Sequence, residues 1–223
     1  MNLHQNCCGM IVGTPRSGKS GMLLRVAEML KAGSFQNQIY VIDSTQKGLS
    51  SLMEDAQDYT RSDDLAGVDS IFTKLIKELI ERQKAQSVTK GRQNDSFDND
   101  QWILSYPQIC LLIDDLGETI ELVDQDDNVY KRLNALVKNA VGLGLILIAA
   151  ACAQDVKEMY TTNPIVSKLV GGQNGLAVSG SASLHSYYQQ KNLGFEEKTT
   201  ELKNRFGLLY DNGEAHKVKL MEA

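Results

Sequence analysis

This chain has no excess of basic residues, and that absence limits the partners that it can bind. The 223 residues include 28 acidic and 23 basic side chains, which gives a formal net charge of −5. An acidic balance argues against a nucleic-acid groove as the main feature, because phosphate backbones are bound by clustered lysine and arginine. The argument is weaker for a ring-shaped ATPase, in which only one rim of the ring has to be basic.

Cysteines are few and show no spacing that would suit a metal site. The four of them are Cys7, Cys8, Cys110 and Cys152. The adjacent pair is poorly placed to form a disulfide with itself, and the other two lie in apolar, strand-like runs. We expect all four to be reduced, which is typical of a cytosolic protein.

Long apolar runs are also absent. The longest, residues 141–152, has about a dozen residues, whereas a transmembrane helix needs about 20. There is no secretory signal, so we expect any membrane anchor to lie outside this chain. With 42% hydrophobic and 23% charged residues, the composition is that of an ordinary globular protein. A chain of this length can bury about 70% of its unfolded surface without disulfide or metal staples.

One stretch near the start of the chain matches the phosphate-binding pattern G-x-x-x-x-G-K-[ST] without substitution. It consists of Gly13, Thr14, Pro15, Arg16, Ser17, Gly18, Lys19 and Ser20. The glycines let successive backbone N–H groups point into one anion-binding concavity. Lys19 can then reach the β- and γ-phosphates, and the Ser20 hydroxyl can hold Mg²⁺. A strand-like run over residues 8–12 and a helix-like run over 21–30 place this loop at a helix N-terminus. The sequence therefore predicts a nucleoside-triphosphate site.

The rest of the chain alternates strand-like and helix-like patterns, which predicts an α/β fold with a mostly parallel sheet and helices on both faces. Expected strands cover residues 39–42, 107–113, 145–151 and 175–178, and expected helices cover 68–80, the region after Asp127 and a short piece after Asn163-Pro164. The chain closes with a predicted β-hairpin, residues 206–210 and 215–220, around Asn212-Gly213. Residues 49–60 are ambiguous, 86–101 indicate a mobile loop, and 185–190 are compatible with a helix. No repeat or linker divides residues 1–223, so we expect one domain.

Two acids follow the strand expected over residues 107–113. In open α/β sheets, ligands bind at the carboxyl ends of the strands. Asp114 stands where a phosphate-binding loop needs its metal-side carboxylate, and Asp115 is the candidate catalytic base beside it. The alternative is a solvated turn that merely ends the strand.

Other P-loop classes fit less well than motor ATPases. The sequence has no N-K-x-D motif, which a GTP-binding switch protein needs to read its base. Its arginines are scattered, whereas a small-molecule kinase would carry them in a lid. The strand and helix between the loop strand and the Asp114 strand favour a motor ATPase.

The order of these motifs resembles the FtsK/SpoIIIE group of ring-forming motors. The resemblance rests on residues 13–20, 39–43, 111–115 and 141–150 and covers nearly the whole chain. Within this group, the chain is most similar to the carboxyl-terminal ATPase modules of the EssC-type coupling ATPases of type VII secretion. The resemblance implies a RecA-like P-loop NTPase sheet, with ATP and Mg²⁺ as cofactors. It also implies a cytosolic module of a membrane-anchored, multi-domain parent chain, with a possible homo-oligomeric ring. The implied partners are adjacent ATPase modules and small helical secreted proteins that carry a carboxyl-terminal signal.

The chain departs from that family at three positions that matter for hydrolysis. Asp115 stands where family motors have a glutamate that orients the attacking water. Residues 149–152, Ala-Ala-Ala-Cys, replace a Thr-Gln pair that senses the γ-phosphate, and Lys138-Asn139 stand where a trans-acting arginine is expected. A misplaced base costs about 10²–10⁴ in rate, and a missing arginine about 10³–10⁵. We therefore expect ATP binding with weak or absent hydrolysis.

Two alternatives remain open. In the first, the chain is an active motor in which Asp115 reaches the water and a partner subunit supplies the cation. The second, DNA translocation, is disfavoured by the acidic balance. The remaining conspicuous side chains have structural interpretations: we expect His185 on the surface or in a helix rather than at a metal, and Tyr187, Tyr188 and Trp102 in packing or at a rim.

Overall fold

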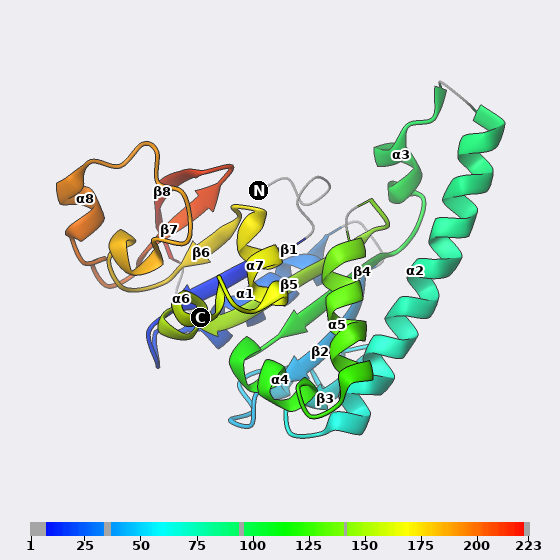
Figure 1. Cartoon of the computed structure of the whole chain (residues 1–223), viewed down its shortest axis with the longest axis horizontal. Coiled ribbons are helices and arrows are strands. Elements are labelled where there is room, and N and C mark those ends of the chain that lie inside the picture. Colours follow the sequence, from blue (N-terminus) through cyan, green and yellow to red (C-terminus); the bar gives the residue numbers. More distant parts are fainter. Residues whose placement is uncertain (1–7, 34–36, 94–95, 141, 221–223) are drawn as a thin grey trace.

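The computed structural model describes residues 8–33, 37–93, 96–140 and 142–220, so Cys7 and the first residue of the 141–152 run lie outside the described residues. Eight strands in this part of the chain form one sheet in the order β3-β2-β4-β5-β1-β6-β7-β8 (Figure 1). The strands are β1 (Cys8–Gly13), β2 (Asn37–Asp43), β3 (Asp58–Arg61), β4 (Gln108–Ile113), β5 (Leu145–Cys152), β6 (Gly175–Ala177), β7 (Phe206–Asp211) and β8 (Glu214–Lys219). All neighbours from β3 to β6 pair in parallel, and β6-β7-β8 are antiparallel. The predicted mostly parallel sheet with a closing hairpin is confirmed.

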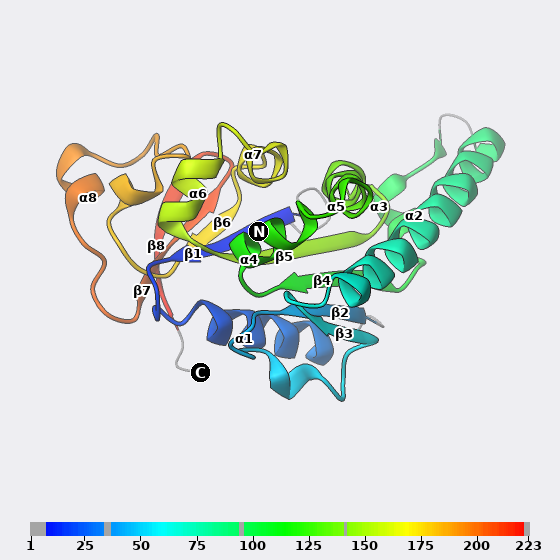
Figure 2. The ribbon, with the colours of Figure 1, turned by 60° about the horizontal axis from the view of Figure 1, so that its bottom comes forward.

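Helices cover both faces of this sheet, as predicted. Figure 2 shows α1 (Lys19–Ala32) on one face, with α2 (Leu65–Gln93), α4 (Leu116–Val123), α5 (Asp127–Asn139), α6 (Ala153–Met159) and α7 (Pro164–Gly171) on the other. The remaining helical segments are α3 (Asn99–Leu104), α8 (Phe195–Thr199) and two 3₁₀ helices, η1 (Ser50–Leu52) and η3 (Ala182–His185). None of the helices in the described ranges is long and apolar enough to cross a membrane.

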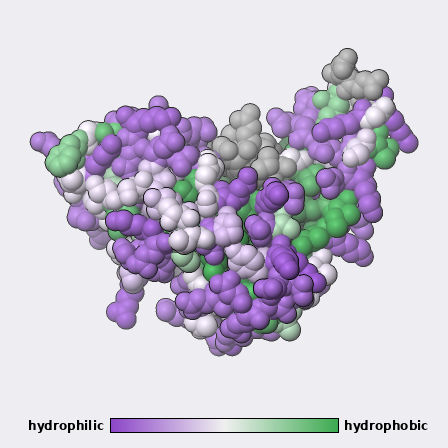
Figure 3. Space-filling view, in the orientation of Figure 1, coloured by the Kyte–Doolittle hydropathy of each residue, from purple (hydrophilic) through white to green (hydrophobic). Residues whose placement is uncertain are grey.

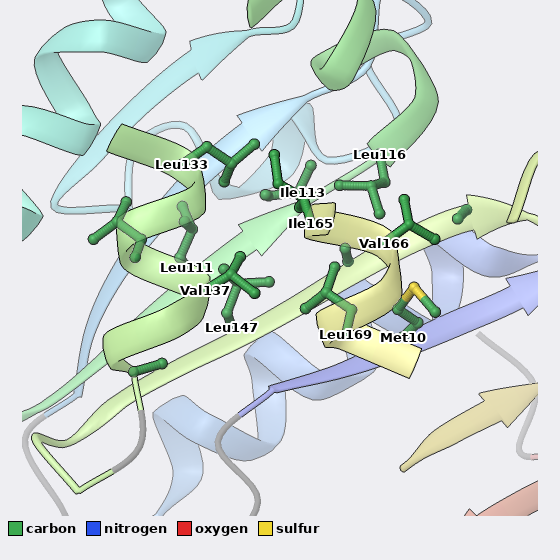
Figure 4. Close-up of a cluster of buried hydrophobic side chains, with 14 of the residues drawn as sticks. Met10, Leu111, Ile113, Leu116, Leu133, Val137, Leu147, Ile165, Val166 and Leu169 are labelled. Carbon is green, nitrogen blue, oxygen red and sulfur yellow. The ribbon is translucent and has the colours of Figure 1, made fainter. Parts of the chain in front are cut away.

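The central strands are apolar throughout because both of their faces are covered. Successive side chains of a strand point to opposite faces, so Leu111 and Ile113 of β4 pack toward α5 and α7, whereas Cys110 and Leu112 pack toward α1. Figure 4 shows the first of these layers, with Leu147 among its members. Full burial of one such aliphatic side chain is worth about 1.5–3 kcal/mol. Packing on both faces therefore holds the central strands in place, including their carboxyl ends.

The loop predicted over residues 86–101 is wrong for much of its length. Helix α2 runs on to Gln93, and α3 begins at Asn99 with the Asp98 side chain accepting from two backbone N–H groups of its first turn. Figure 1 shows that the end of α2 extends beyond the sheet, so this part of the helix needs no apolar stripe. It contains no proline that would interrupt the helix, although Gly91 weakens it. The apolar periodicity is therefore absent because this part of the helix does not pack against the sheet, not because the helix is absent.

The ambiguous residues 49–60 form η1 and the edge strand β3. Asp43, at the carboxyl end of β2, holds both in place: its carboxylate accepts from Leu49 N at 3.0 Å and from the Tyr59 hydroxyl at 2.5 Å. Burial of the Tyr59 phenol and its bond to Asp43 raise the tyrosine pKa, so the hydroxyl remains a donor. The acid predicted at the end of β2 therefore orders the neighbouring edge of the sheet.

The region after β5 contains one confirmed prediction and one error. Helix α7 starts where Asn163-Pro164 predicts it, with the Asn163 side chain accepting from two backbone N–H groups. The helix expected over residues 185–190 is wrong: η3 ends at His185 and turns follow. His185 is also fully buried rather than on the surface.

The three aromatic side chains expected in packing or at a rim, Tyr187, Tyr188 and Trp102, do pack against other rings. Tyr187 lies 5.1 Å from Tyr188, and Tyr188 stacks on Tyr210 at 4.5 Å, measured between ring centroids. Trp102 packs against Tyr106 at 4.9 Å. Among the described residues, Cys110 and Cys152 are free thiols, as predicted.

The surface in the view of Figure 3 is largely hydrophilic, with an apolar patch where α2 and α5 meet. The residues that line a small groove there are Ile76, Leu79, Ile80, Gln83, Ala135, Asn139 and Leu143. Ile80 is 46% exposed. The seam between these two helices therefore stays partly open to solvent.

Candidate nucleotide site

The predicted phosphate-binding loop joins the last residue of β1 to the first turn of α1. Arg16 and Gly18 have left-handed backbone conformations, with φ of 60° and 90°. Such alternation turns successive N–H groups toward one side of a loop. Gly13 is confined by its surroundings: a Cβ there would lie 2.5 Å from Ser17 Oγ and 2.9 Å from Ser179 Oγ. Gly18 is therefore required for its left-handed conformation, and Gly13 is required because a side chain would not fit there.

Lys19 and Ser17 face this loop with groups that suit a phosphate. Lys19 Nζ donates to the carbonyl oxygen of Thr14 at 3.0 Å, so the ammonium lies over the loop. Ser17 Oγ is buried and has no hydrogen-bond partner among the described residues. A buried hydroxyl without a partner costs about 1–3 kcal/mol, and a phosphate oxygen would satisfy it. The loop also opens onto the N-terminus of α1, where anions bind favourably. The residues present therefore fit a triphosphate.

Ser20 and Asp114, the residues predicted for the metal side, are brought together in the structure. Ser20 Oγ donates to the two carboxylate oxygens of Asp114 at 2.8 and 3.1 Å, and Ser44 Oγ donates to Asp114 Oδ2 at 2.8 Å. Burial raises the pKa of Asp114, and the bonds from the two serines oppose that shift. A hydroxyl and a carboxylate are the hard oxygen ligands that Mg²⁺ takes alongside its waters. No cluster of three or more His, Cys, Asp or Glu side chains suited to a metal occurs in the described ranges, and a site of this kind does not need one.

Asp115 lies beside Asp114 as predicted, but its carboxylate has a structural task. It is the N-cap of α4, and Asp115 Oδ1 accepts from the backbone N–H of Glu118 at 3.1 Å. Its φ is 66°, a left-handed conformation that Asp tolerates better than most residues. Burial raises the pKa of Asp115, and the charges of Glu118 and Asp155 add to the increase. One carboxylate oxygen of Asp115, the candidate base, is therefore occupied in capping α4.

Glu118 is a residue of this region that sequence reasoning missed. Its carboxylate accepts from Thr45 N and Thr45 Oγ1, both at 2.9 Å, and from Ser62 Oγ at 2.6 Å. Burial acts to raise its pKa, but these hydrogen bonds outweigh burial and lower the pKa of Glu118. The ionised side chain therefore ties the loops after β2 and β3 to α4. An acid three residues after the N-cap Asp115 is the only sequence signal that could have suggested it.

Gly48 and Ser44 were also missed, and both belong to the loop after β2. A Cβ on Gly48 would lie 2.7 Å from Asp114 Oδ2 and 2.8 Å from Ser20 Cβ. The loop backbone therefore lies directly against the Ser20–Asp114 pair. The Lys47-Gly48 dipeptide is a turn signal, with Lys47 at φ 57°, but nothing in the sequence says what the turn covers.

Strand β5 lies between β1 and β4 and ends beside the phosphate-binding loop. Its register pairs Ala151 with Val12 and Cys152 with Gly13. The alanines at residues 149–151 are buried and present only methyl groups.

Lys138 and Asn139, which stand at the expected arginine position, do not lie at the phosphate-binding loop. Lys138 and Asn139 end α5, which leads into the amino end of β5, opposite to the edge with the phosphate-binding loop. Asn139 Nδ2 donates to the carbonyl oxygen of Ala135 at 2.8 Å. Neither side chain therefore contributes to this chain's own site.

No protein-family model matches the chain, and no curated protein matches it in sequence. Solved structures do resemble it in fold. The cytoplasmic domain of EssC matches with a TM-score of 0.78 and 18% identity over 99% of this chain and 40% of that one. EccC of Thermomonospora curvata (ATPases 2 and 3), in complex with a signal sequence peptide, gives 0.68 and 17% over 100% and 38%.

The pCW3 conjugation coupling protein TcpA, in its monomer form with ATPγS, gives a TM-score of 0.69 and 15% identity over 98% of this chain and 61% of that one. This chain thus spans less than two thirds of each of the three structures. The resemblance inferred from the motif order is confirmed at the level of the fold: the chain has the RecA-like P-loop fold found in the ATPase modules of EssC and EccC.

Proposed function

We propose that this chain is an ATP-binding module of a type VII protein-secretion motor in which hydrolysis is weak or absent. ATP then acts as a structural and regulatory ligand. The observation that carries the proposal is a contrast between neighbouring acids. Asp114 is paired with Ser20 at the metal side of the loop, whereas Asp115 is used as a helix cap.

Binding would involve the whole motif. The backbone N–H groups of residues 16–20 would surround the phosphates, Lys19 would reach the β- and γ-phosphates, and Ser17 Oγ would gain a partner. Ser20 and Asp114 would hold Mg²⁺, which neutralises charge on the β- and γ-phosphates when bound. A ligand that binds only the folded state also stabilises it, by about 2.7 kcal/mol at a hundred times its dissociation constant. TcpA, which shares the fold, was solved with ATPγS, and this supports a nucleotide at the same place here.

Weak hydrolysis follows from the groups around the γ-phosphate position. A catalytic base must be able to approach a water, and Asp115 Oδ1 is already bonded to the backbone of its own helix. Residues 149–151 offer only methyl groups. Losses of this kind are not additive, but either alone reduces turnover strongly.

The parent and partners are proposed from the structures that share the fold. This chain spans 40% of the EssC cytoplasmic domain and 38% of an EccC structure with two ATPase modules. We infer one module on the cytosolic side of a membrane-anchored parent, next to further ATPase modules, in a parent that can assemble into a ring. The EccC structure holds a signal sequence peptide, which supports small helical secreted proteins with a carboxyl-terminal signal as substrates.

The experiment that tests nucleotide binding is calorimetric titration with Mg-ATP and Mg-GTP, using wild type, Lys19→Ala and the control Lys77→Ala. Lys77 is exposed on α2. Lys19→Ala should weaken ATP binding about 10- to 100-fold, because a hydrogen bond to a charged group is lost, and Lys77→Ala should change nothing. Unaltered affinity in Lys19→Ala would refute the role of the loop.

An active motor is the second candidate, and one observation favours it. A Cβ on Gly117 would lie 3.2 Å from Asp115 Oδ1 and 3.5 Å from Asp155 Oδ2. The carboxylates of Asp115 and Asp155 therefore both lie close to Gly117, which has no side chain to separate them. Asp155 could then act as the catalytic base where Asp115 cannot. Turnover that Asp155→Asn abolishes would favour this candidate over a hydrolysis-deficient module.

A further inference from the structure

The phosphate-binding loop is attached to a residue far outside its motif. The backbone N–H of Thr14 donates to Ser179 Oγ at 2.8 Å, and Thr14 Oγ1 lies 2.9 Å from the same oxygen. The two residues are separated by 165 positions in the sequence. Ser179 follows β6, which pairs with β1 on the side away from β5. The first turn of the loop is therefore hydrogen-bonded to the chain leaving a neighbouring strand.

Packing reinforces these hydrogen bonds. The pairing of β1 with β6 extends past the strand end, where Val178 N donates to the carbonyl oxygen of Val12 at 2.8 Å. A Cβ on Gly13 would lie 2.8 Å from Val178 Cγ2 and 2.9 Å from Ser179 Oγ. The base of the loop is thus in close contact with residues 178–179 and cannot shift without moving them.

Ser179 is in turn held from its other side by the buried His185. His185 Nε2 lies 2.8 Å from the carbonyl oxygen of Ser179, and His185 Nδ1 lies 3.0 Å from the Tyr187 hydroxyl. A carbonyl only accepts, so Nε2 carries the hydrogen, and Nδ1 accepts from the tyrosine. One neutral tautomer therefore satisfies both contacts, and burial, which lowers the pKa of His185, favours that neutral form.

We propose that Ser179 is a positioning residue of the nucleotide site. It fixes the first turn of the phosphate-binding loop so that the following N–H groups are already arranged for phosphate. Preorganisation of this kind raises affinity because less conformational freedom is lost on binding. The inference rests on the proposed function, since it assumes that the loop binds a triphosphate. It adds that nucleotide affinity depends on Ser179 and on the residues that hold it, Val178 and His185, which no phosphate-loop motif includes.

The same segment connects the loop to the far part of the sheet. Gly180 O accepts from Leu202 N at 3.3 Å, and Ser183 Oγ donates to the carbonyl oxygen of Lys198 at 2.9 Å. Lys198 belongs to α8, which lies at the opposite end of the molecule from the end of α2 (Figure 1). The segment that carries Ser179 is therefore itself held by hydrogen bonds to residues 198–202.

The test compares Ser179→Ala with the control Ser181→Ala. Ser181 is two residues further along, and its side chain makes none of the hydrogen bonds found among the described residues. Three quantities are measured for each variant: the unfolding temperature, the hydrogen-exchange rate of the Thr14 amide without nucleotide, and the Mg-ATP dissociation constant. We expect Ser179→Ala to speed exchange at Thr14 and to weaken Mg-ATP binding about three- to tenfold. The unfolding temperature should stay close to that of Ser181→Ala, which itself should match wild type.

A double-mutant cycle with Thr14→Val separates positioning from a general loss of structure. Residues in direct contact show a coupling energy, whereas independent sites are additive. The effects of Ser179→Ala and Thr14→Val on Mg-ATP affinity should therefore be less than additive. If wild type binds Mg-ATP and Ser179→Ala binds equally well with unchanged exchange at Thr14, the positioning role is refuted and the proposed function stands. If wild type does not bind Mg-ATP, both are refuted.

Discussion

Ser20 Oγ lies 2.8 and 3.1 Å from the two carboxylate oxygens of Asp114, although 94 positions separate the residues in sequence. The contact joins the end of the phosphate-binding loop to the end of β4, across the width of β5. A hydroxyl and a carboxylate held together in this way would suit one side of the proposed magnesium site. The surroundings of this pair lead to specific predictions.

Gly48→Ala should disturb the metal side of the site without unfolding the chain. Its new Cβ would lie 2.7 Å from Asp114 Oδ2 and 2.9 Å from Ser20 Oγ, so the loop after β2 or the pair itself has to shift. Overpacking of this kind costs about 1–3 kcal/mol, which corresponds to a loss of about 5- to 150-fold in Mg-ATP affinity where the strain falls on the site. Titration calorimetry at saturating Mg²⁺ measures it.

Gly91→Ala is the matched control for that substitution. Nothing lies within 4 Å of a Cβ at Gly91, which is in helix α2. The change should leave Mg-ATP affinity untouched and stabilise the protein by up to about 1 kcal/mol, because alanine favours helix over glycine. Equal affinity in the Gly48 and Gly91 variants would contradict the close approach of the loop.

Glu118→Gln should destabilise the protein in a pH-dependent way. The folded-state pKa of Glu118 lies below its ordinary value of 4.5, so the folded state binds fewer protons than the unfolded state in that range. Its contribution is therefore present above about pH 4.5 and is lost as the pH falls through the lowered value. Thermal unfolding from pH 7 to pH 3 should show wild type more stable than Glu118→Gln at pH 7, with the gap closing in acid.

Glu121→Gln provides the comparison on the same helix. Glu121 is exposed on α4, so this variant should follow wild type across the whole pH range. A gap between wild type and Glu118→Gln that stays constant down to pH 3 would show that the ionised carboxylate is not what binds Thr45 and Ser62.

Asp115 can be assigned to capping or to catalysis by comparing two substitutions. Asparagine caps helices as well as aspartate does and tolerates the left-handed φ of 66° seen here. Asp115→Asn should therefore keep both stability and Mg-ATP affinity, whereas Asp115→Ala should lose about 1–2 kcal/mol of stability. Chemical denaturation measures the difference, and equal destabilisation by the two substitutions would argue against the cap.

The parts of this molecule that could be predicted from sequence are those specified by consecutive residues. The phosphate-binding loop is a run of eight positions, and the strand before Asp114 is apolar because both faces of β4 are buried. The closing hairpin likewise follows from Asn212-Gly213, both of which have positive φ.

The parts that could not be predicted depend on contacts between distant segments. Gly48 and Ser179 reach the loop from the ends of other strands, and neither belongs to a motif. The far half of α2 lacks an apolar stripe because it extends past the sheet, and periodicity detects helices only where they pack. His185 appeared isolated in sequence, yet it is fully buried and hydrogen-bonded to Ser179 and Tyr187.

The central claim is that the loop holds Mg-ATP without splitting it. It is tested most directly by a single-turnover assay with excess protein and γ-labelled ATP, after titration has established the dissociation constant. The account predicts that the nucleotide is bound and recovered as ATP after many minutes, with no difference between wild type and Asp115→Asn. Rapid release of phosphate that Asp115→Asn abolishes would contradict it, as would failure of wild type to bind Mg-ATP at millimolar concentration.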